Sequence, residues 1–476
     1  MIIPPTSMSV GSTALCDQFR FLLGNITIPP TSSEYNSISD ENWSETTWMK
    51  PSCIVQPLTA LEVQKIVRTL VRTNTSFAIR SGGHSPSPGA ANIDNGVLID
   101  MSRLDQVTFD AESSLATVGS GQTWSNVYES LDRYNVTIVG GRVLDVGVGG
   151  LVLGGGLSYL TDLYGLVCDN VVNFQVVTAN GSMINANATS NPDLWWALKG
   201  GSNNFGVVTS FTLNTYPIHT VWGGIKEYAL EYLPDIMAAM YIYQSNPNKD
   251  AYANLMLQAF TTNSSVGVVL NMVYLKPVEN PPAFEPFYQF PTIDDTTKLQ
   301  TLTEMISGQR VPNIPRWDWH ATSFEPDADL YQEIANITLH APELKQIESL
   351  TSGSLALGLQ PISTNAVLAG QARGGNPLGL RSVNQTWFVL DVGWNDASGD
   401  AIAHNATASM RAKVEAASKK HNKYVEYIFM NDASHSQDVI EHYGEASVEK
   451  LKAVERKYDP TSAFHRWVPG GFKVPE

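Results

Sequence analysis

The placement of the glycines constrains this chain more than any other feature. They cluster at Gly82-Gly83, Gly140-Gly141, Gly147 with Gly149-Gly150, Gly154-Gly155-Gly156 and Gly200-Gly201. The total, 36 glycines in 476 residues, is ordinary, so the signal lies in where they stand. Glycine-rich loops let the backbone take positive φ and approach a ligand closely, and their successive N–H groups can hold an anion such as a pyrophosphate.

A single glycine cluster is usually a turn. Here several lie in one half of the chain; one follows an apolar strand at Phe77–Arg80, and another opens a helix at Gly154–Leu157. This combination favours a dinucleotide cofactor. The chain has no Walker loop and no Rossmann G-x-G-x-x-G followed by an acidic residue at the usual spacing, which argues against nicotinamide bound in that way. Because H-E-x-x-H and C-x-x-C motifs are also absent, no metal is expected.

The charge balance excludes other partners. There are 46 acidic and 30 basic side chains, a net charge of −16, whereas nucleic-acid binding needs a clustered positive surface. No apolar run approaches the roughly 20 residues that cross a bilayer, so no membrane partner is expected. The length and the 43% hydrophobic share predict a soluble chain of two or three domains.

Cysteine and asparagine usage bears on the cellular compartment. Of Cys16, Cys53 and Cys168, the first two can form one disulfide. Glycosylation sequons occur at Asn25, Asn42, Asn74, Asn135, Asn180, Asn187, Asn263, Asn336, Asn384 and Asn405. We expect a secreted glycoprotein, with a chance distribution of sequons as the alternative. Residues Met1–Ser7 lack the basic and apolar regions of a signal peptide, so either a leader has been removed or the protein is cytoplasmic.

The hydrophobic pattern predicts an α+β fold. Residues 1–55 are expected to be irregular apart from a helix near Ala14–Leu23. The predicted strands that follow are Phe77–Ile79, Val97–Ile99, a hairpin over Val107–Val118, Val172–Thr178, Met183–Asn185 and Val207–Leu213, with helices at Leu61–Thr73, Thr123–Tyr134 and Asp193–Leu198. Asn180-Gly181 is a strong hairpin signal.

Composition changes after Tyr216-Pro217, where the glycine clusters give way to segments rich in proline and aromatic residues. Beyond it, strands are predicted at Ala253–Thr261, Val266–Tyr274, Trp387–Val392 and Tyr424–Met430, and helices at Tyr232–Tyr243, Pro342–Ser349 and Ala406–His421. We predict a cofactor domain made of residues 1–217 and 437–476, and a second domain, an antiparallel sheet with helices over 218–436, that faces the substrate.

His84 stands in the loop Arg80-Ser-Gly-Gly-His-Ser85, directly after a strand. A lone loop histidine is usually a surface or hydrogen-bonding residue. This loop is accompanied, in order, by Val146–Gly156, Asp169–Val172, Asp193–Gly201, Asn204–Val208, Tyr458–Pro460 and Pro469–Lys473. The set resembles the fungal-type, berberine-bridge-enzyme-like FAD-linked oxidases of the vanillyl-alcohol-oxidase superfamily, which share a PCMH-type FAD-binding fold of two domains.

The resemblance implies FAD joined covalently through His84 to the 8α-methyl carbon of the flavin. Arg80, Ser81, Gly82, Gly83 and Ser85 would wrap the pyrophosphate. The isoalloxazine and adenosine would be held by Val143, Val146, Gly147, Gly149, Gly150, Gly154, Gly155, Gly156, Asn204, Gly206 and Val208, with Asn431 approaching the flavin from a later segment.

Two valines refine this expectation. Many family members carry a second, cysteinyl tether where this chain has Val143, so the resemblance implies a single histidyl link and a weaker oxidant. A valine at the position of Val146 accompanies reaction of the reduced flavin with O2 in related enzymes, so O2 is the expected acceptor and H2O2 the expected product. The alternative is that Val146 is only a packing residue.

The candidate catalytic residues lie in the second domain. Tyr427-Ile-Phe-Met-Asn431-Asp432 resembles the family segment in which an asparagine approaches the flavin and a following tyrosine helps to deprotonate the substrate; Asp432 replaces that tyrosine. Asp391 interrupts an apolar run, and a desolvated carboxylate there would have a raised pKa suited to a general base. An edge-strand or turn-facing aspartate is the alternative. Tyr427 is a third candidate base, with a core aromatic as the alternative.

We therefore expect an FAD oxidase that takes hydride from a C–H bond next to oxygen or nitrogen in a small alcohol, amine or phenol of secondary metabolism. Carbohydrate oxidation is the runner-up. The rivals are a redox-neutral cyclisation or rearrangement on the same flavin fold, and a secreted binding protein on a degenerate one. The expected assembly is a monomer or weak homodimer.

Overall fold

The computed structural model describes residues 12–263, 267–308 and 313–476. Its first sheet has the order β1-β2-β4-β3, with β1 antiparallel to β2 and the other pairs parallel. The strands are β1 Thr27–Ile28, β2 Cys53–Val55, β3 Phe77–Arg80 and β4 Val97–Asp100. Because β1 and β2 pair into this sheet, the prediction that residues 1–55 are irregular beyond one helix was wrong.

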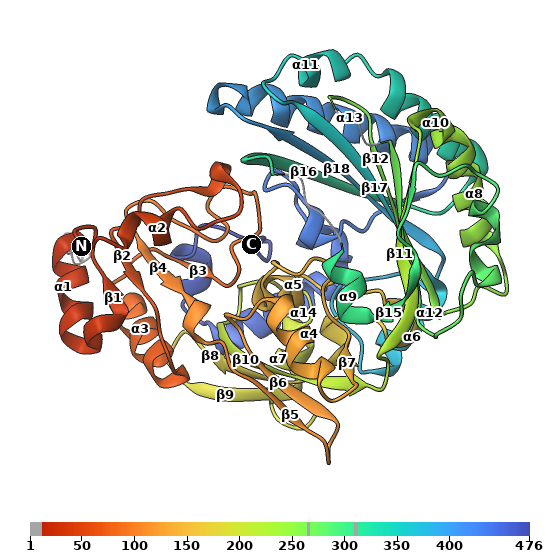
Figure 1. Cartoon of the computed structure of the whole chain (residues 1–476). Helices are drawn as coiled ribbons and strands as arrows, with labels where there is room; N and C mark the ends of the chain where they lie inside the picture. The colour runs from red at the N-terminus through yellow and green to blue at the C-terminus, as the bar shows by residue number, and fades with distance from the viewer. Residues whose placement is uncertain (1–11, 264–266, 309–312) are drawn as a thin grey trace.

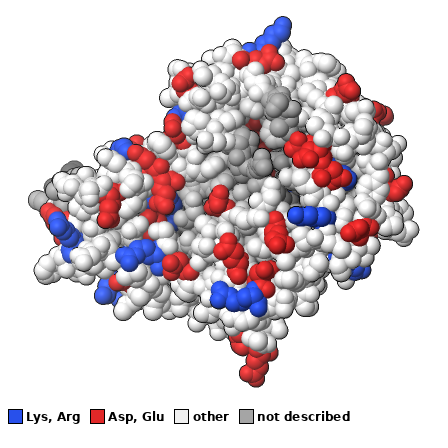
Figure 2. All heavy atoms as spheres, viewed as in Figure 1, with Lys and Arg blue, Asp and Glu red and all other residues white. Residues whose placement is uncertain are grey.

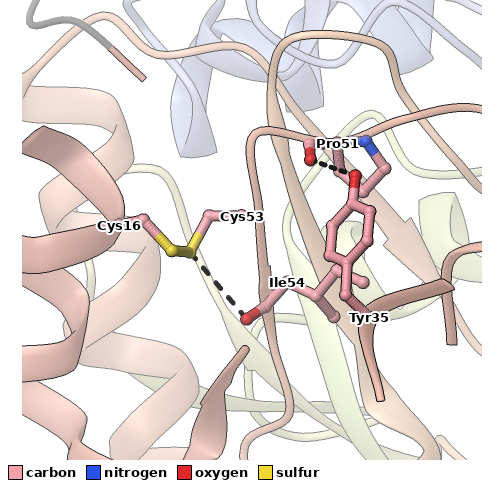
Figure 3. The surroundings of a disulfide bond; sticks show 5 residues. All are labelled: Cys16, Tyr35, Pro51, Cys53 and Ile54. Carbon is pink, nitrogen blue, oxygen red and sulfur yellow. Dashed lines mark hydrogen bonds between the residues drawn. A yellow bond between two sulfur atoms is a disulfide. The ribbon is translucent and has the colours of Figure 1, made fainter. Parts of the chain in front are cut away.

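Two helices cover this sheet (Figure 1). Helix α3, Ala60–Arg72, begins with a capping box in which the Thr59 hydroxyl accepts from Glu62 N and the Glu62 carboxylate accepts from Thr59 N. Helix α1, Ser12–Leu23, is joined to β2 by a disulfide between Cys16 and Cys53, as predicted (Figure 3).

The second sheet has the order β5-β6-β10-β8-β9, with β7 paired to β10, and every pair is antiparallel. Its strands are β5 Val107–Asp110, β6 Leu115–Gly119, β7 Thr137–Ile138, β8 Val171–Val177, β9 Met183–Asn187 and β10 Val207–Tyr216. Both predicted hairpins are confirmed. Between β8 and β9 the chain turns with Gly181 at a φ of +76°, which only glycine adopts without strain.

The third sheet is wholly antiparallel, with the order β14-β11-β13-β12-β17-β18-β16-β19 and β15 paired to β11. Its strands are β11 Thr220–Tyr228, β12 Ala253–Phe260, β13 Val268–Tyr274, β14 Asp294–Asp295, β15 Lys298–Thr301, β16 Arg316–Phe324, β17 Ser354–Ile362, β18 Gln385–Trp394 and β19 Tyr424–Val425. Helices α8 Leu233–Ser245, α10 Ala328–His340, α11 Leu344–Glu348 and α13 Asp400–Lys420 cover its outer face (Figure 1). The other face is turned toward the first two sheets (Figure 1).

The remaining helices are short, except for α14. They are α2 Tyr35–Ser39, α4 Trp124–Asp132, α5 Val148–Leu153, α6 Thr161–Tyr164, α7 Pro192–Leu198, α9 Leu302–Ser307, α12 Thr364–Ala372, α14 Glu445–Tyr458 and α15 Ala463–Arg466. Short 3-10 turns occupy Gly24–Ile26, Glu45–Thr47, Met101–Arg103, Cys168–Asn170, Leu230–Tyr232, Pro282–Phe287, Ala397–Gly399, Met430–Asp432 and Ile440–Tyr443.

Two predicted elements were wrong in a way that matters for the site. No helix opens at Gly154; instead Gly154 ends α5, and the positive φ of Gly155 and Gly156 turns the chain away. The predicted strand Tyr424–Met430 pairs only over Tyr424–Val425, after which the chain leaves the sheet. This departure carries Asn431 to the end of α5.

One hydrophobic core joins the two predicted domains. Val152 and Leu166, from the predicted cofactor domain, belong to the same buried cluster as Val221, Trp387 and Tyr427 from the second. A separate core lies between the third sheet and its outer helices. The boundaries at 217 and 436 therefore stay a prediction, because the packing runs across them.

On the face shown in Figure 2, acidic side chains are more widespread than basic ones, and most of the surface carries neither. This agrees with the net charge of −16. Among the described residues, no helix combines the length and the apolar character that crossing a membrane requires.

The disulfide generates a stability prediction. It closes a loop between residues 37 positions apart, and chain entropy assigns such a crosslink about 4 kcal/mol. We expect the Cys16→Ser/Cys53→Ser double variant to lose 2–4 kcal/mol of unfolding free energy in urea denaturation, as an approximate range. Wild-type protein under reducing conditions should match the variant; an unchanged denaturation midpoint in both would show that this bridge does not stabilise the fold.

Candidate active site

Two glycine loops cross at the centre of the molecule. A Cβ on Gly82 would lie 2.4 Å from the backbone N of Gly147, and one on Gly147 would lie 2.2 Å from the N of Gly82. No side chain fits at either position. Ser81 fastens the crossing, because its hydroxyl donates to the carbonyl of Ser120 at 2.7 Å and accepts from the N–H of Gly149 at 3.1 Å.

The crossing forms one wall of a cavity of about 410 Å³. The predicted cofactor residues that line this cavity are Ser81, Gly82, Gly83, His84, Ser85, Val143, Val146, Gly147, Gly149, Gly150, Gly154, Gly206, Val208 and Asn431. Gly471 and Phe472, near the C-terminus, also line it. The glycine loops predicted to act together therefore do meet around one space.

Four predicted cofactor residues do not line the cavity. Arg80 is buried, and its guanidinium binds Asp100, Glu41 and Asn42 instead of reaching the cavity, so its role is to hold the loop from behind. Asn204 donates to the carbonyls of Gly201 and Phe472 and thereby ties the C-terminal segment to the site. Gly155 and Gly156 form only the turn after α5.

His84 lies in an aromatic setting. Its ring stacks on Trp43 with centroids 4.3 Å apart and an interplanar angle of 7°, and Trp319 lies 5.9 Å away. The backbone N–H of Trp43 donates to the carbonyl of Gly83 at 3.1 Å, which fixes the loop against this ring. Burial lowers the pKa of His84 to about 4, so the imidazole is neutral at pH 7 and keeps a nitrogen lone pair for bond formation.

Part of the inner face of the third sheet forms the opposite wall. Alternate residues of four adjacent strands point into the cavity: Met256, Gln258 and Phe260 on β12, Ala356, Gly358 and Gln360 on β17, Val389 and Asp391 on β18, and Trp317 and Trp319 on β16. The residues between them pack on the outer helices. The wall is therefore apolar and aromatic, with a few polar groups.

Asp391 is central in this wall. Strand β18 pairs with both β16 and β17, so the alternative of an edge-strand or turn-facing aspartate is wrong. Burial, and then the charges of Asp432 and Asp318, hold the pKa of Asp391 well above its usual range. With its pKa raised, the Asp391 carboxylate is a stronger proton acceptor than an exposed aspartate.

Asp432 belongs to a polar chain at the same wall. Its Oδ2 accepts from Gln360 Nε2 at 2.6 Å, and the amide oxygen of Gln360 in turn accepts from Arg142. Burial raises the pKa of Asp432, while the charge of Arg142 acts in the opposite direction. Arg142 and Gln360 were missed from the sequence, because nothing in their local pattern marks residues 142 and 360 as neighbours.

Asn431 and Tyr427 have different positions. The Asn431 side chain accepts from Gly156 N at 3.1 Å and donates to the carbonyl of Gly150 at 3.2 Å, so it ties α5 to the turn that follows it while lining the cavity. Tyr427 does not line the cavity; it is buried against Trp387 and Tyr443, and burial holds its pKa well above the usual range. The structure therefore assigns it the core role that was the alternative.

The cavity fits a dinucleotide. The hydroxyl of Ser120 is buried in its wall with no hydrogen-bond partner among the described residues, beside the crossing of the two glycine loops. Such a combination of a free hydroxyl and glycine backbone suits phosphate oxygens. Ser81, Ser120 and the loops at 82–85 and 146–150 would hold FAD, which when bound supplies hydride acceptance.

Comparisons with known proteins agree with this geometry. A family model described as "FAD binding domain" matches residues 51–187. The chain is 36% identical over 451 residues to the bifunctional solanapyrone synthase of Alternaria solani, covering 94% of this chain and 86% of that protein. It is also 36% identical over 462 residues to an FAD-dependent monooxygenase of Arthrobotrys oligospora, covering 96% and 89%.

Among solved structures, glucooligosaccharide oxidase of Acremonium strictum, which carries a 6-S-cysteinyl, 8α-N1-histidyl FAD, has a TM-score of 0.78 at 18% identity over 96% of this chain and 98% of that one. This likeness confirms the α+β, PCMH-type fold. Fold, cavity and relatives together define an FAD-dependent oxidoreductase. The chain belongs to the family of FAD-dependent oxidoreductases that these two relatives represent.

The loop crossing generates a second prediction. Gly147→Ala places a methyl group against backbone that cannot move aside, so we expect a loss of about 2 kcal/mol or more in urea denaturation. The matched control is Gly150→Ala, three residues on, where a Cβ meets nothing within 4 Å; its change should stay within about 0.5 kcal/mol. Equal effects of the two variants would contradict the crossing.

Proposed function

We propose that this protein is an oxidase that uses FAD to oxidise a small natural-product alcohol, amine or phenol, with O2 as the acceptor. One observation carries the proposal: Asp391, a carboxylate with a raised pKa, faces the same cavity as His84 and the glycine loops. A proton acceptor and a hydride acceptor would then lie on either side of a bound substrate.

The residues of the third sheet that line the cavity would have different roles in the reaction. A substrate O–H or N–H proton would pass to the carboxylate of Asp391 as hydride leaves the adjacent carbon. Gln360, held between Arg142 and Asp432, would orient the substrate oxygen or nitrogen through hydrogen bonds. The surrounding sheet face and tryptophans would exclude water and keep the pKa of Asp391 high.

The lining favours a compact, partly aromatic substrate. Trp317, Trp319, Met256 and Phe260 supply apolar and aromatic contact, while only a few polar groups are available for the many hydroxyls of a sugar chain. Oligosaccharide oxidation is therefore the second candidate within the class.

The acceptor is proposed from Val146. This valine lines the cavity beside the glycine loop and leaves more room there than a leucine would. Two relatives are named a synthase and a monooxygenase. The experiment must therefore distinguish an oxidase from a monooxygenase and from a redox-neutral enzyme. Oxidation with one H2O2 formed per product supports the oxidase; 18O from 18O2 found in the product would indicate a monooxygenase; turnover without O2 uptake would indicate redox-neutral chemistry.

We also propose that FAD is joined covalently to His84. The neutral imidazole of His84 is available for bond formation, whereas Val143 offers no sulfur and the buried Cys168 does not line the cavity. After acid precipitation, wild-type protein and the control Cys168→Ser should keep flavin absorbance in the pellet. His84→Ala should release it into the supernatant. Flavin absorbance in the supernatant of the wild-type protein would contradict a covalent link.

The role of Asp391 generates a fourth prediction. A base acts only when deprotonated, so kcat/KM should rise with pH through the raised pKa of Asp391. Asp391→Asn should remove that limb and lower kcat about 10²- to 10⁴-fold. Asp396→Asn, an exposed aspartate just after the same strand, is the matched control and should leave the profile unchanged. If kcat/KM of Asp391→Asn still rises with pH, another residue is the base, and Asp432→Asn is the next variant to measure.

We also propose passage through an oxidising compartment. The Cys16–Cys53 disulfide supports this, since such bonds persist mainly in secreted proteins. Seven of the sequon asparagines are exposed: Asn25, Asn74, Asn135, Asn180, Asn263, Asn336 and Asn405. Asn42 is buried and bonded to Arg80, so glycosylation of the folded chain is not expected there.

A further inference from the structure

Three metal-ligating side chains gather on the face of the third sheet that is turned away from the cavity. Asp318 and His320 lie two residues apart on β16 and so project from the same face, and His404 reaches them from α13. One donor atom from each lies within 4.8 Å of the others. Because Trp317 and Trp319 point to the other face, this cluster is separate from the proposed active site.

The spacing of the cluster matches one metal ion. His404 Nδ1 lies 3.2 Å from Asp318 Oδ1, and His320 Nε2 lies 3.2 Å from Asp318 Oδ2. The rings of His320 and His404 have centroids 5.0 Å apart. Ligands bound tetrahedrally to Zn²⁺ at about 2.0–2.1 Å have donor atoms roughly 3.3 Å apart and imidazole centroids about 5 Å apart.

His320 supplies a second, independent observation. It is 2% exposed, yet neither of its ring nitrogens makes a hydrogen bond within the described part of the chain, although Nε2 lies close to Asp318. Oδ2 of Asp318 is also without a hydrogen bond there. Burying a polar atom without a hydrogen bond costs free energy. A bound cation would take up a ring nitrogen of His320 and the Asp318 carboxylate, which contact each other only as an ion pair at 3.2 Å.

We propose that Asp318, His320 and His404 form a site for a divalent transition metal, Zn²⁺ in the first place, and that His435, whose donor atoms lie outside the 4.8 Å group of the other three, turns toward the metal as fourth ligand. The His435 ring centroid lies 5.2 Å from that of His404, on the segment just after Asp432. Imidazole and carboxylate donors at tetrahedral spacing suit Zn²⁺ better than Mg²⁺ or Ca²⁺, which prefer oxygen ligands.

The metal would have a structural role. Gln437 already fastens this segment to β16, accepting from Ala321 N at 2.9 Å and donating to the Ala321 carbonyl at 2.8 Å. A metal shared by β16, α13 and His435 would lock the same segment at a second point. It would thereby hold Asp432 in place at the wall of the cavity without taking part in the chemistry.

The test is metal binding by the full-length flavoprotein. Protein treated with chelator and dialysed is titrated with Zn²⁺ alone in a calorimeter, and its zinc content is measured by mass spectrometry after gel filtration. One Zn²⁺ per chain and a raised melting temperature are expected. Zinc no higher than in a buffer blank would overturn the proposal, whatever the variants do.

Variants locate the site. Asp318→Asn, which keeps the shape of the side chain, and His404→Gln should each weaken Zn²⁺ binding at least about 10-fold while retaining the flavin spectrum. The matched control is His340→Ala, an exposed histidine at the end of α10, which should bind Zn²⁺ as wild type does. Equal binding by all of these proteins would place the zinc on another surface and refute the site.

Discussion

The backbone contact between Gly82 and Gly147 is the constraint on which the rest of the site depends. Two loops from separate sheets touch there at distances that no Cβ allows. The contact fixes His84 on one side and the start of α5 on the other. The Asn431 side chain then forms hydrogen bonds with Gly150 in α5 and with Gly156 just after it. These bonds fix the second wall of the cavity relative to the first.

The cofactor side of the site was predictable because its signal is local. A glycine pair after an apolar strand marks a loop with exposed backbone wherever it occurs, and the histidine sits inside that loop. The prediction failed where a side chain could turn either way. Arg80 is adjacent to the loop in sequence, but an arginine is long enough to reach the buried Asp100 instead of the cavity. A sequence pattern does not decide between these two directions.

The substrate side was only partly predictable. Asp391 could be found because a single charge in an apolar strand is rare, and it proved to lie in the middle of the sheet. Gln360 and Arg142 carry no such mark, since strand β17 and the loop before α5 meet only through the tertiary fold. The cluster at Asp318 and His404 was unpredictable for the same reason. Its members come from a strand and a helix with no ligand-spacing motif between them.

The shared core has a consequence for how this protein unfolds and diversifies. Trp387 and Val221 pack with Val152 and Leu166 in one buried cluster, so separating the cofactor layer from the large sheet would expose apolar surface on both. Such a chain should melt as one cooperative unit rather than as two independent modules. Substrate preference can then change through substitutions on the face of the third sheet that lines the cavity. Side chains there can be exchanged without disturbing the shared core.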